Sequence, residues 1–85
     1  MTKREIQVRV PGGMEASPVA LFVQTANRFS SSIYLETGTT KVNAKSIMGM
    51  MSVVLNYEDK ILITADGPDE KEALDAMEQF LTHLA

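Results

Sequence analysis

The chain has 85 residues, of which 45% are hydrophobic and 22% are charged, and it contains no cysteine. This length fits one small domain, expected to span residues 1–85, and the missing cysteines exclude disulfides and thiolate metal sites. The net charge is −3 and the basic residues are scattered, so neither direct nucleic-acid binding nor membrane insertion is expected. No metal site and no cofactor are expected, and without a secretory leader the expected location is the cytoplasm.

The first quarter of the chain predicts a strand followed by a helix. Residues 5–10 alternate apolar and polar side chains, as in a half-buried strand. Residues 11–13 (Pro-Gly-Gly) interrupt this pattern, and Ser17 before Pro18 predicts the N-cap of a helix. That helix has an apolar stripe and ends at the serines of residues 30–32. The stripe comprises Val19, Phe22, Val23, Ala26 and Phe29.

The middle of the chain predicts a hairpin and a short helix. Ile33 and Leu35 begin a strand, and residues 37–39 (Thr-Gly-Thr) predict the turn that leads into a second strand at residues 41–43. Ser46 is a favourable N-cap, and it predicts a short, methionine-rich helix that extends to about residue 54.

The last third of the chain predicts one more strand and the longest helix. Residues 56–59 form a turn, and Ile61, Ile63 and Ala65 alternate as in a strand. Asp69 and Glu72 are spaced as a capping pair at the start of the helix. Its apolar stripe comprises Ala73, Leu74, Met77, Phe80, Leu81 and Leu84.

These elements follow the order strand, helix, strand, strand, helix, strand, helix. Helices with a single apolar stripe need the face of a sheet to cover, which predicts a two-layer sandwich. The pattern alone does not separate this arrangement from a ferredoxin-like one.

Two sequence blocks carry more information than the pattern. Residues 13–20 read Gly-Met-Glu-Ala-Ser-Pro-Val-Ala, and residues 41–52 read Lys-Val-Asn-Ala-Lys-Ser-Ile-Met-Gly-Met-Met-Ser. Together they resemble HPr, the small phosphocarrier family of the bacterial sugar phosphotransferase system. The resemblance covers nearly the whole chain. It implies an α+β fold, a two-layer open-faced sandwich with a four-stranded antiparallel sheet and three helices on one face.

The first block departs from the family at the residues that carry its chemistry. In HPr proteins a histidine receives the phosphoryl group and an arginine steadies its charge, whereas Glu15 and Ser17 occupy those two positions here. The chain is therefore expected to have no catalytic residue and no phosphocarrier activity, and it is not expected to be an enzyme. The missing histidine is typical of the Crh (catabolite repression HPr) subgroup. Ser17 departs further, because that subgroup retains the arginine.

Three interpretations of Glu15 stay open. It could be a solvated loop carboxylate, or a charge that favours the helix N-terminus by about 0.3–1 kcal/mol. The third hypothesis is that it places a permanent negative charge where a phosphoryl group sits in relatives. Partner affinity measured for Glu15→Gln would separate this hypothesis from the other two.

The second block is typical of the regulatory serine of the family. An N-cap role alone would account for Ser46, but the match around it is long, and some apolar residues of so short a helix must be exposed. The resemblance implies that an HPr kinase/phosphorylase phosphorylates Ser46 and that the product is a corepressor of a LacI-type catabolite control protein. The implied partner-binding residues are Lys45, Ile47, Met48, Met51, Ala20 and Gln24.

Two other functions remain as alternatives. One is a phosphocarrier-type component that binds sugar transport proteins, and the other is a small non-catalytic α+β binding module. Because Pro-Gly-Gly follows a strand that could lie at a sheet edge, a homodimer formed by strand exchange is a further hypothesis.

Overall fold

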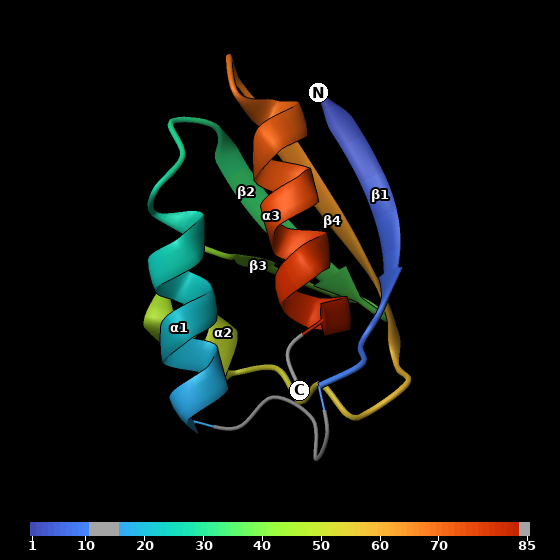
Figure 1. Cartoon of the computed structure of the whole chain (residues 1–85). Helices are drawn as coiled ribbons and strands as arrows, with labels where there is room; N and C mark the ends of the chain where they lie inside the picture. Colours follow the sequence, from blue (N-terminus) through green and yellow to red (C-terminus); the bar gives the residue numbers. More distant parts are fainter. Residues whose placement is uncertain (11–15, 84–85) are drawn as a thin grey trace.

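A computed structural model describes residues 1–10 and 16–83, and its elements follow the predicted order. These elements are β1 (Thr2–Gln7), α1 (Ala16–Ala26), β2 (Ser32–Thr37), β3 (Thr40–Asn43), α2 (Ile47–Met51), β4 (Lys60–Asp66) and α3 (Glu70–His83). Figure 1 shows α1 and α3 side by side in front of the sheet.

The four strands form one antiparallel sheet in the order β1-β4-β2-β3. The β2–β3 hairpin closes with the pair Thr37 and Thr40, so its turn has only two residues. The first of them, Gly38, has a φ of +58°, a conformation that glycine adopts without steric cost. The predicted hairpin is therefore confirmed, and β1 and β3 lie at the two edges of the sheet.

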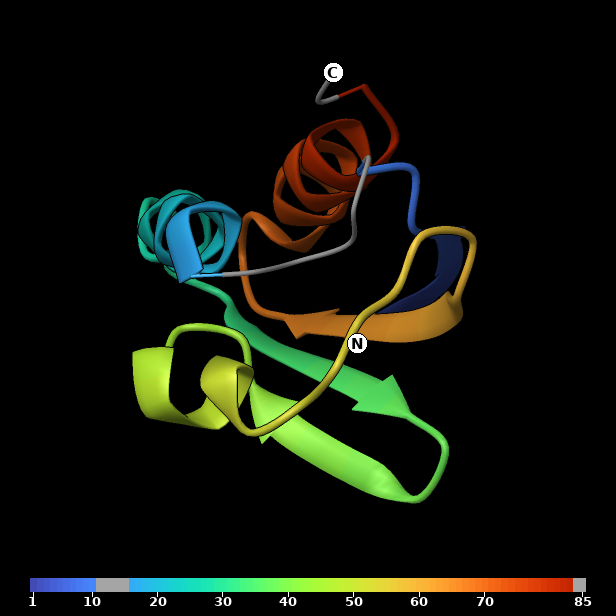
Figure 2. The same ribbon diagram turned by 90° about the horizontal axis from the view of Figure 1, so that it is seen from below.

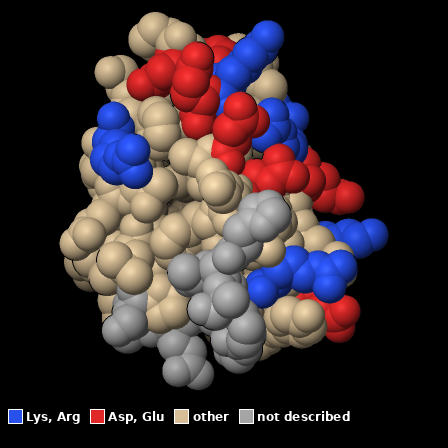
Figure 3. Space-filling model, in the orientation of Figure 1, with Lys and Arg blue, Asp and Glu red and all other residues tan. Residues whose placement is uncertain are grey.

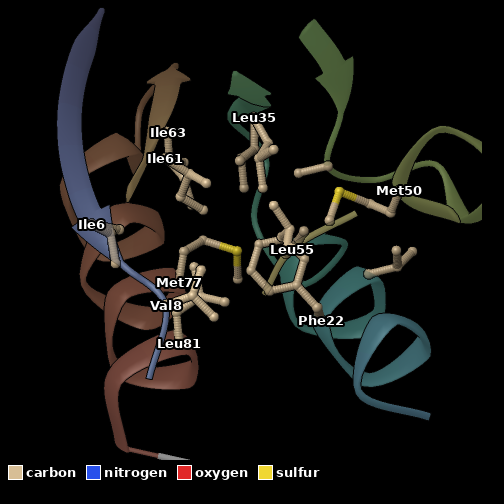
Figure 4. Packing of buried hydrophobic residues seen from close by; sticks show 14 of the residues in the cluster. Ile6, Val8, Phe22, Leu35, Met50, Leu55, Ile61, Ile63, Met77 and Leu81 are labelled. Carbon is tan, nitrogen blue, oxygen red and sulfur yellow. The ribbon is translucent and has the colours of Figure 1, made fainter. Parts of the chain in front are cut away.

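One face of the sheet is covered by helices and the other faces solvent. Figure 2 shows α1 and α3 above the sheet, with the short α2 near the end of β3. Ile33, Leu35 and Ile63 point to the covered face and are fully buried, as their alternation with polar residues predicts. Phe22 of α1 and Phe80 of α3 meet edge to face with ring centroids 5.5 Å apart. Figure 4 shows these layers closing on one hydrophobic core, and the predicted open-faced α+β sandwich is confirmed.

The predicted position of the first strand was wrong by three residues. β1 covers Thr2–Gln7 rather than residues 5–10, because its ladder with β4 runs from the Thr2–Ala65 pair to the Gln7–Lys60 pair. The next two amides leave the ladder: Val8 N donates to the carbonyl of Asp59 and Arg9 N to that of Leu81. The ladder therefore ends where β4 begins, although Val8 and Val10 are buried as predicted.

Two helices also differ from the prediction at their ends. α1 begins at Ala16, so Ser17 lies inside its first turn rather than before it, and Pro18 is tolerated there because first-turn amides lack intrahelical acceptors. After Ala26 the chain tightens, since Arg28 N donates to the carbonyl of Thr25. α2 ends at Met51 instead of near residue 54, and the amide of Ser52 closes it on the carbonyls of Gly49 and Met50.

The predicted capping pair at the start of α3 is not the arrangement found. The Asp69 carboxylate accepts hydrogen bonds from the amides of Ser30 and Ser31, both at 2.9 Å, and from the Ser31 hydroxyl. Glu70 rather than Glu72 folds back, accepting from Gly67 N at 3.4 Å. The side chain of Asp69 therefore fastens the connection between α1 and β2 to the start of α3.

Candidate functional site

Ser46 is the N-cap of α2, as predicted. Its backbone is extended (φ −104°, ψ 118°), and its Oγ accepts a hydrogen bond from Gly49 N at 3.1 Å. Its carbonyl accepts the first helical bond, from Met50 N at 2.9 Å. The residue is half-buried, so part of it stays in contact with solvent.

The segment before Ser46 is held in a turn of its own. The side-chain oxygen of Asn43 accepts from Lys45 N at 2.8 Å, and the Asn43 carbonyl accepts from Ser46 N at 3.0 Å. Ala44 is fully buried and its amide donates to the carbonyl of Ile33 at 2.9 Å. A Cβ added to Gly49 would lie 3.4 Å from both Ser46 Oγ and the Asn43 carbonyl, so this turn and α2 approach each other closely.

α2 presents an apolar surface to solvent. Only Met50 of its five residues is buried, and Figure 4 shows its side chain pointing into the core cluster. Ile47, Met48 and Met51 are 47%, 82% and 64% exposed, which confirms the expectation that so short a helix cannot bury all its apolar residues. Methionine is flexible and adapts to partner surfaces. We call Ser46 with these three residues the α2 surface.

α1 supplies the neighbouring part of the same side of the molecule. Ala20 is half-buried and Gln24 is exposed. Both lie on the helix face of Asn27, seven and three residues away, and the Asn27 amide donates to the Lys45 carbonyl at 3.1 Å. The fold therefore brings Ala20 and Gln24 to the side of α1 that adjoins α2. Leu21 and Val54, 50% and 74% exposed, are apolar surface residues that sequence reasoning missed.

Lys45 is less available to solvent than the sequence suggested. It is half-buried, and its Nζ donates to the carbonyl of Phe29 at 2.7 Å, just beyond the end of α1. Asn27, which sequence reasoning also missed, bonds to both Val23 O and Lys45 O. The available signal was a side-chain donor directly after the last helical residue, where carbonyls need partners from outside the helix.

The structure adds little at the first block. Glu15 lies outside the described residues, and Ser17 is the second residue of α1. The three interpretations of Glu15 therefore remain predictions.

The charges are unevenly distributed over the face of the molecule that Figure 3 shows. In Figure 3 the carboxylates gather over α3, in the upper part of the view, and the side of α1 is largely uncharged. Among residues 1–10 and 16–83, no three His, Cys, Asp or Glu side chains are grouped so as to hold a metal ion. None of the described helices is long and apolar enough to cross a bilayer.

Comparison with known proteins places these features in a family. Residues 2–83 match the family model described as "PTS HPr component phosphorylation site". The chain is 44% identical over 81 residues to the HPr-like proteins Crh of Halalkalibacterium halodurans and Bacillus subtilis. These alignments cover 95% of this chain and 96% and 95% of the two relatives.

Solved structures of the family have the same fold. Phosphocarrier protein HPr of Bacillus anthracis matches with a TM-score of 0.91 and 44% identity, covering 94% of this chain and 95% of that one. The crystal structure of Bacillus subtilis Crh, a dimer with a swapping domain, matches with a TM-score of 0.78 and 42% identity, over 100% and 98% of the chains. Identity alone therefore does not separate Crh from HPr, so the assignment to a subgroup depends on position 15.

Proposed function

Since the chain belongs to the HPr family of the phosphotransferase system, we propose that it is a regulatory phosphoprotein whose switch is Ser46. The observation that supports this most is the position of Ser46, which caps α2 beside three exposed apolar side chains, Ile47, Met48 and Met51. In this role an HPr kinase/phosphorylase transfers the γ-phosphoryl group of ATP to Ser46 Oγ and later removes it.

Phosphorylation at this position changes the surface and keeps the fold. A phosphoryl group adds a charge of about −1.5 to −2 and three strong acceptor oxygens. Negative charge is favourable at a helix N-terminus, so α2 should persist after the modification. The added charge would then be recognised by Arg or Lys of a partner, next to apolar contacts from Ile47 and Met48.

The partner in this proposal is a LacI-type catabolite control protein, for which the phosphorylated chain acts as corepressor. Its binding surface combines the α2 surface with Ala20 and Gln24 of α1 and with Lys45, which flanks the phosphorylated serine. The chain reaches DNA only through that regulator. It acts without a cofactor and in the cytoplasm.

The second candidate function is phosphoryl transfer to sugar transport proteins. The identity of 44% to an HPr phosphocarrier supports it. The chemistry of position 15 opposes it, because a histidine phosphoramidate passes its phosphoryl group on readily and Glu15 offers no imidazole. We therefore propose that the chain is neither a competent phosphocarrier nor an enzyme.

One experiment tests both functions. The chain is incubated with ATP and an HPr kinase, and in parallel with phosphoenolpyruvate and enzyme I, and the products are analysed by intact mass and phosphosite mapping. We expect phosphate on Ser46 in the first reaction, none in Ser46→Ala, and none in the second reaction. Phosphate acquired from enzyme I would support the phosphocarrier function, and no phosphate in either reaction would contradict the regulatory switch.

We also propose that the chain forms a homodimer by exchange of β1. The Crh protein of Bacillus subtilis, 42% identical to this chain, crystallises as an intertwined dimer with a swapping domain. In this chain β1 lies at the sheet edge and pairs with one neighbour, β4. The predicted hinge at residues 11–13 lies outside the described residues.

A further inference from the structure

Two side chains connect the α2 surface to the end of α1, and neither belongs to the surface itself. Asn27 donates from its side-chain amide to the Lys45 carbonyl at 3.1 Å, and Lys45 donates from its ammonium to the Phe29 carbonyl at 2.7 Å. Each segment thus supplies a side-chain donor to a backbone acceptor of the other. We call these two hydrogen bonds the Asn27–Lys45 clamp.

The clamp joins short stretches of chain just outside two helices: Phe29 lies three residues after the end of α1, and Lys45 directly precedes the N-cap of α2. The last turn of α1 contributes through Val23, whose carbonyl is among those at a helix C-terminus that need donors from beyond the helix. Val23 O receives both the amide and the side chain of Asn27, each at 2.9 Å, so Asn27 is fixed from one side by its own helix. The other hydrogen of its side-chain amide is thereby directed at Lys45 O. This bond both connects Lys45 to α1 and fixes the direction in which the Lys45 carbonyl points.

The turn that the clamp holds is the one that orients Ser46. Asn43 bonds to the amides of both Lys45 and Ser46, and Ser46 Oγ accepts from Gly49 N. Displacement of Lys45 would therefore be transmitted through the backbone directly to the capping serine. The clamp thus ties the turn that carries Ser46 to the end of α1.

We propose that Asn27 and Lys45 are positioning residues that present Ser46 to its kinase, and that the Lys45 ammonium acts through Phe29 O rather than as a contact to the partner. This inference rests on the proposed phosphorylation of Ser46. It changes the role of Lys45 from a flanking contact to a part of the scaffold, and it adds Asn27 to the functional residues.

The kinetics of Ser46 phosphorylation distinguish a positioning role of Asn27 and Lys45 from a direct contact between Lys45 and the kinase. We expect Asn27→Ala and Lys45→Met each to lower kcat with ATP and HPr kinase several-fold, up to about tenfold, as the loss of the one clamp hydrogen bond that each side chain makes would. KM should change little. The double variant should be no slower than the slower single variant, because both changes break one unit. Lys45→Arg should restore the rate, since a guanidinium can also donate to Phe29 O.

Two controls complete the experiment. Lys41→Met removes the same charge from an exposed lysine on β3 and should leave the kinetics unchanged. Hydrogen exchange of the Gly49 amide, measured by NMR without any partner, reports the bond to Ser46 Oγ directly. Its protection should fall in Asn27→Ala and Lys45→Met and be retained in Lys41→Met.

The outcomes that overturn the proposal are distinct from failure of the proposed function. If Lys45→Met raises KM while Asn27→Ala has no effect, Lys45 is a direct kinase contact and the clamp has no positioning role. If the unaltered chain is not phosphorylated at all, the proposed function fails, and unchanged Gly49 protection in both variants would then refute the clamp independently.

Discussion

A single carboxylate, that of Asp69, connects the start of α3 to the chain between α1 and β2. The hydrogen bond from the Ser31 hydroxyl, followed by those from the backbone amides of Ser30 and Ser31, lowers the pKa of Asp69 below its ordinary value of 3.8. A Cβ on Gly67 would lie 2.6 Å from Ser31 Oγ, which shows how closely the two segments approach. The ionised form of Asp69 is therefore a stabilising part of the native state.

We expect Asp69→Asn to lower the Tm at pH 7, because the amide provides a weaker acceptor and no charge. A carboxyl whose pKa is lowered by folding adds stability above its unfolded pKa, and this stability is lost as the pH falls through the folded value. The difference in Tm between Asp69→Asn and the unaltered chain should thus be largest above about pH 4 and become smaller below it. Thermal unfolding followed by circular dichroism across this range measures the difference.

The exposed Glu72, three residues along, provides the control. Glu72→Gln removes a carboxylate from the same helical turn without touching Ser30 or Ser31, and its Tm should differ little from that of the unaltered chain at any pH. If the Tm difference between Asp69→Asn and the unaltered chain stays constant down to acidic pH, the role assigned to the charge of Asp69 is contradicted.

At the scale of elements, α2 is too short to form alone. Helix nucleation is costly, and isolated helices below about 12–15 residues are marginal in water. The five residues of α2 are stabilised by the Ser46 cap, by Ser52 at the other end and by burial of Met50. Its remaining apolar side chains are free to form a surface because the two caps and the buried Met50 hold the helix without them.

Substitutions of two methionines in α2 should have different effects on stability and on binding. Met50→Ala empties a fully buried site and should lower the free energy of unfolding by about 2–5 kcal/mol, whereas Met48→Ala, at 82% exposure, should change it by about 0.5 kcal/mol or less. Met48→Ala should instead weaken binding of the Ser46-phosphorylated chain to the catabolite control protein, by about 1 kcal/mol or more. Urea unfolding measures the change in the free energy of unfolding, and calorimetric titration measures the change in binding. Unchanged binding would remove Met48 from the proposed interface.

At the scale of the whole molecule, β1 is fastened to α3 by ion pairs as well as to β4 by its ladder. Arg4 Nη1 lies 2.7 Å from Asp75 Oδ1 and 2.9 Å from Glu78 Oε1. The Thr2 hydroxyl donates to Glu70, and this hydrogen bond is the largest cause of the lowered pKa of Glu70. In a strand-exchanged dimer the same contacts would form between two chains, so they should slow exchange without favouring either state.

We expect size-exclusion chromatography with light scattering to show a dimer fraction that rises with concentration. Arg4→Met should leave that fraction unchanged at equilibrium and speed its relaxation after dilution by about three- to tenfold, the range expected for two partly exposed ion pairs. Lys3→Met removes the same charge from the neighbouring exposed residue and should not change the rate. Only monomer at every concentration would refute the proposed exchange.

The sequence by itself determined the order of the elements and most of the core. Alternation at Ile33 and Leu35 and helical spacing at Phe22 and Met77 identified buried faces correctly, because burial of one face imposes a period of 2 or 3.6. Ser46 as an N-cap was equally local, since its hydroxyl and the Gly49 amide that donates to it are three residues apart. The two sequence blocks indicated the family, which patterning alone could not separate from a ferredoxin-like fold.

Only the tertiary structure decided the features that depend on residues distant in sequence. The limits of β1 depend on where β4 begins, and Thr2-Lys3-Arg4 carries no alternation from which to predict them. Asp69 has the local spacing of a capping residue, but its carboxylate is used by amides 38 and 39 residues away. Lys45 likewise bonds to a carbonyl 16 residues earlier. Local preferences fix which element forms, whereas the partners of a polar side chain depend on which segments the folded core brings next to it.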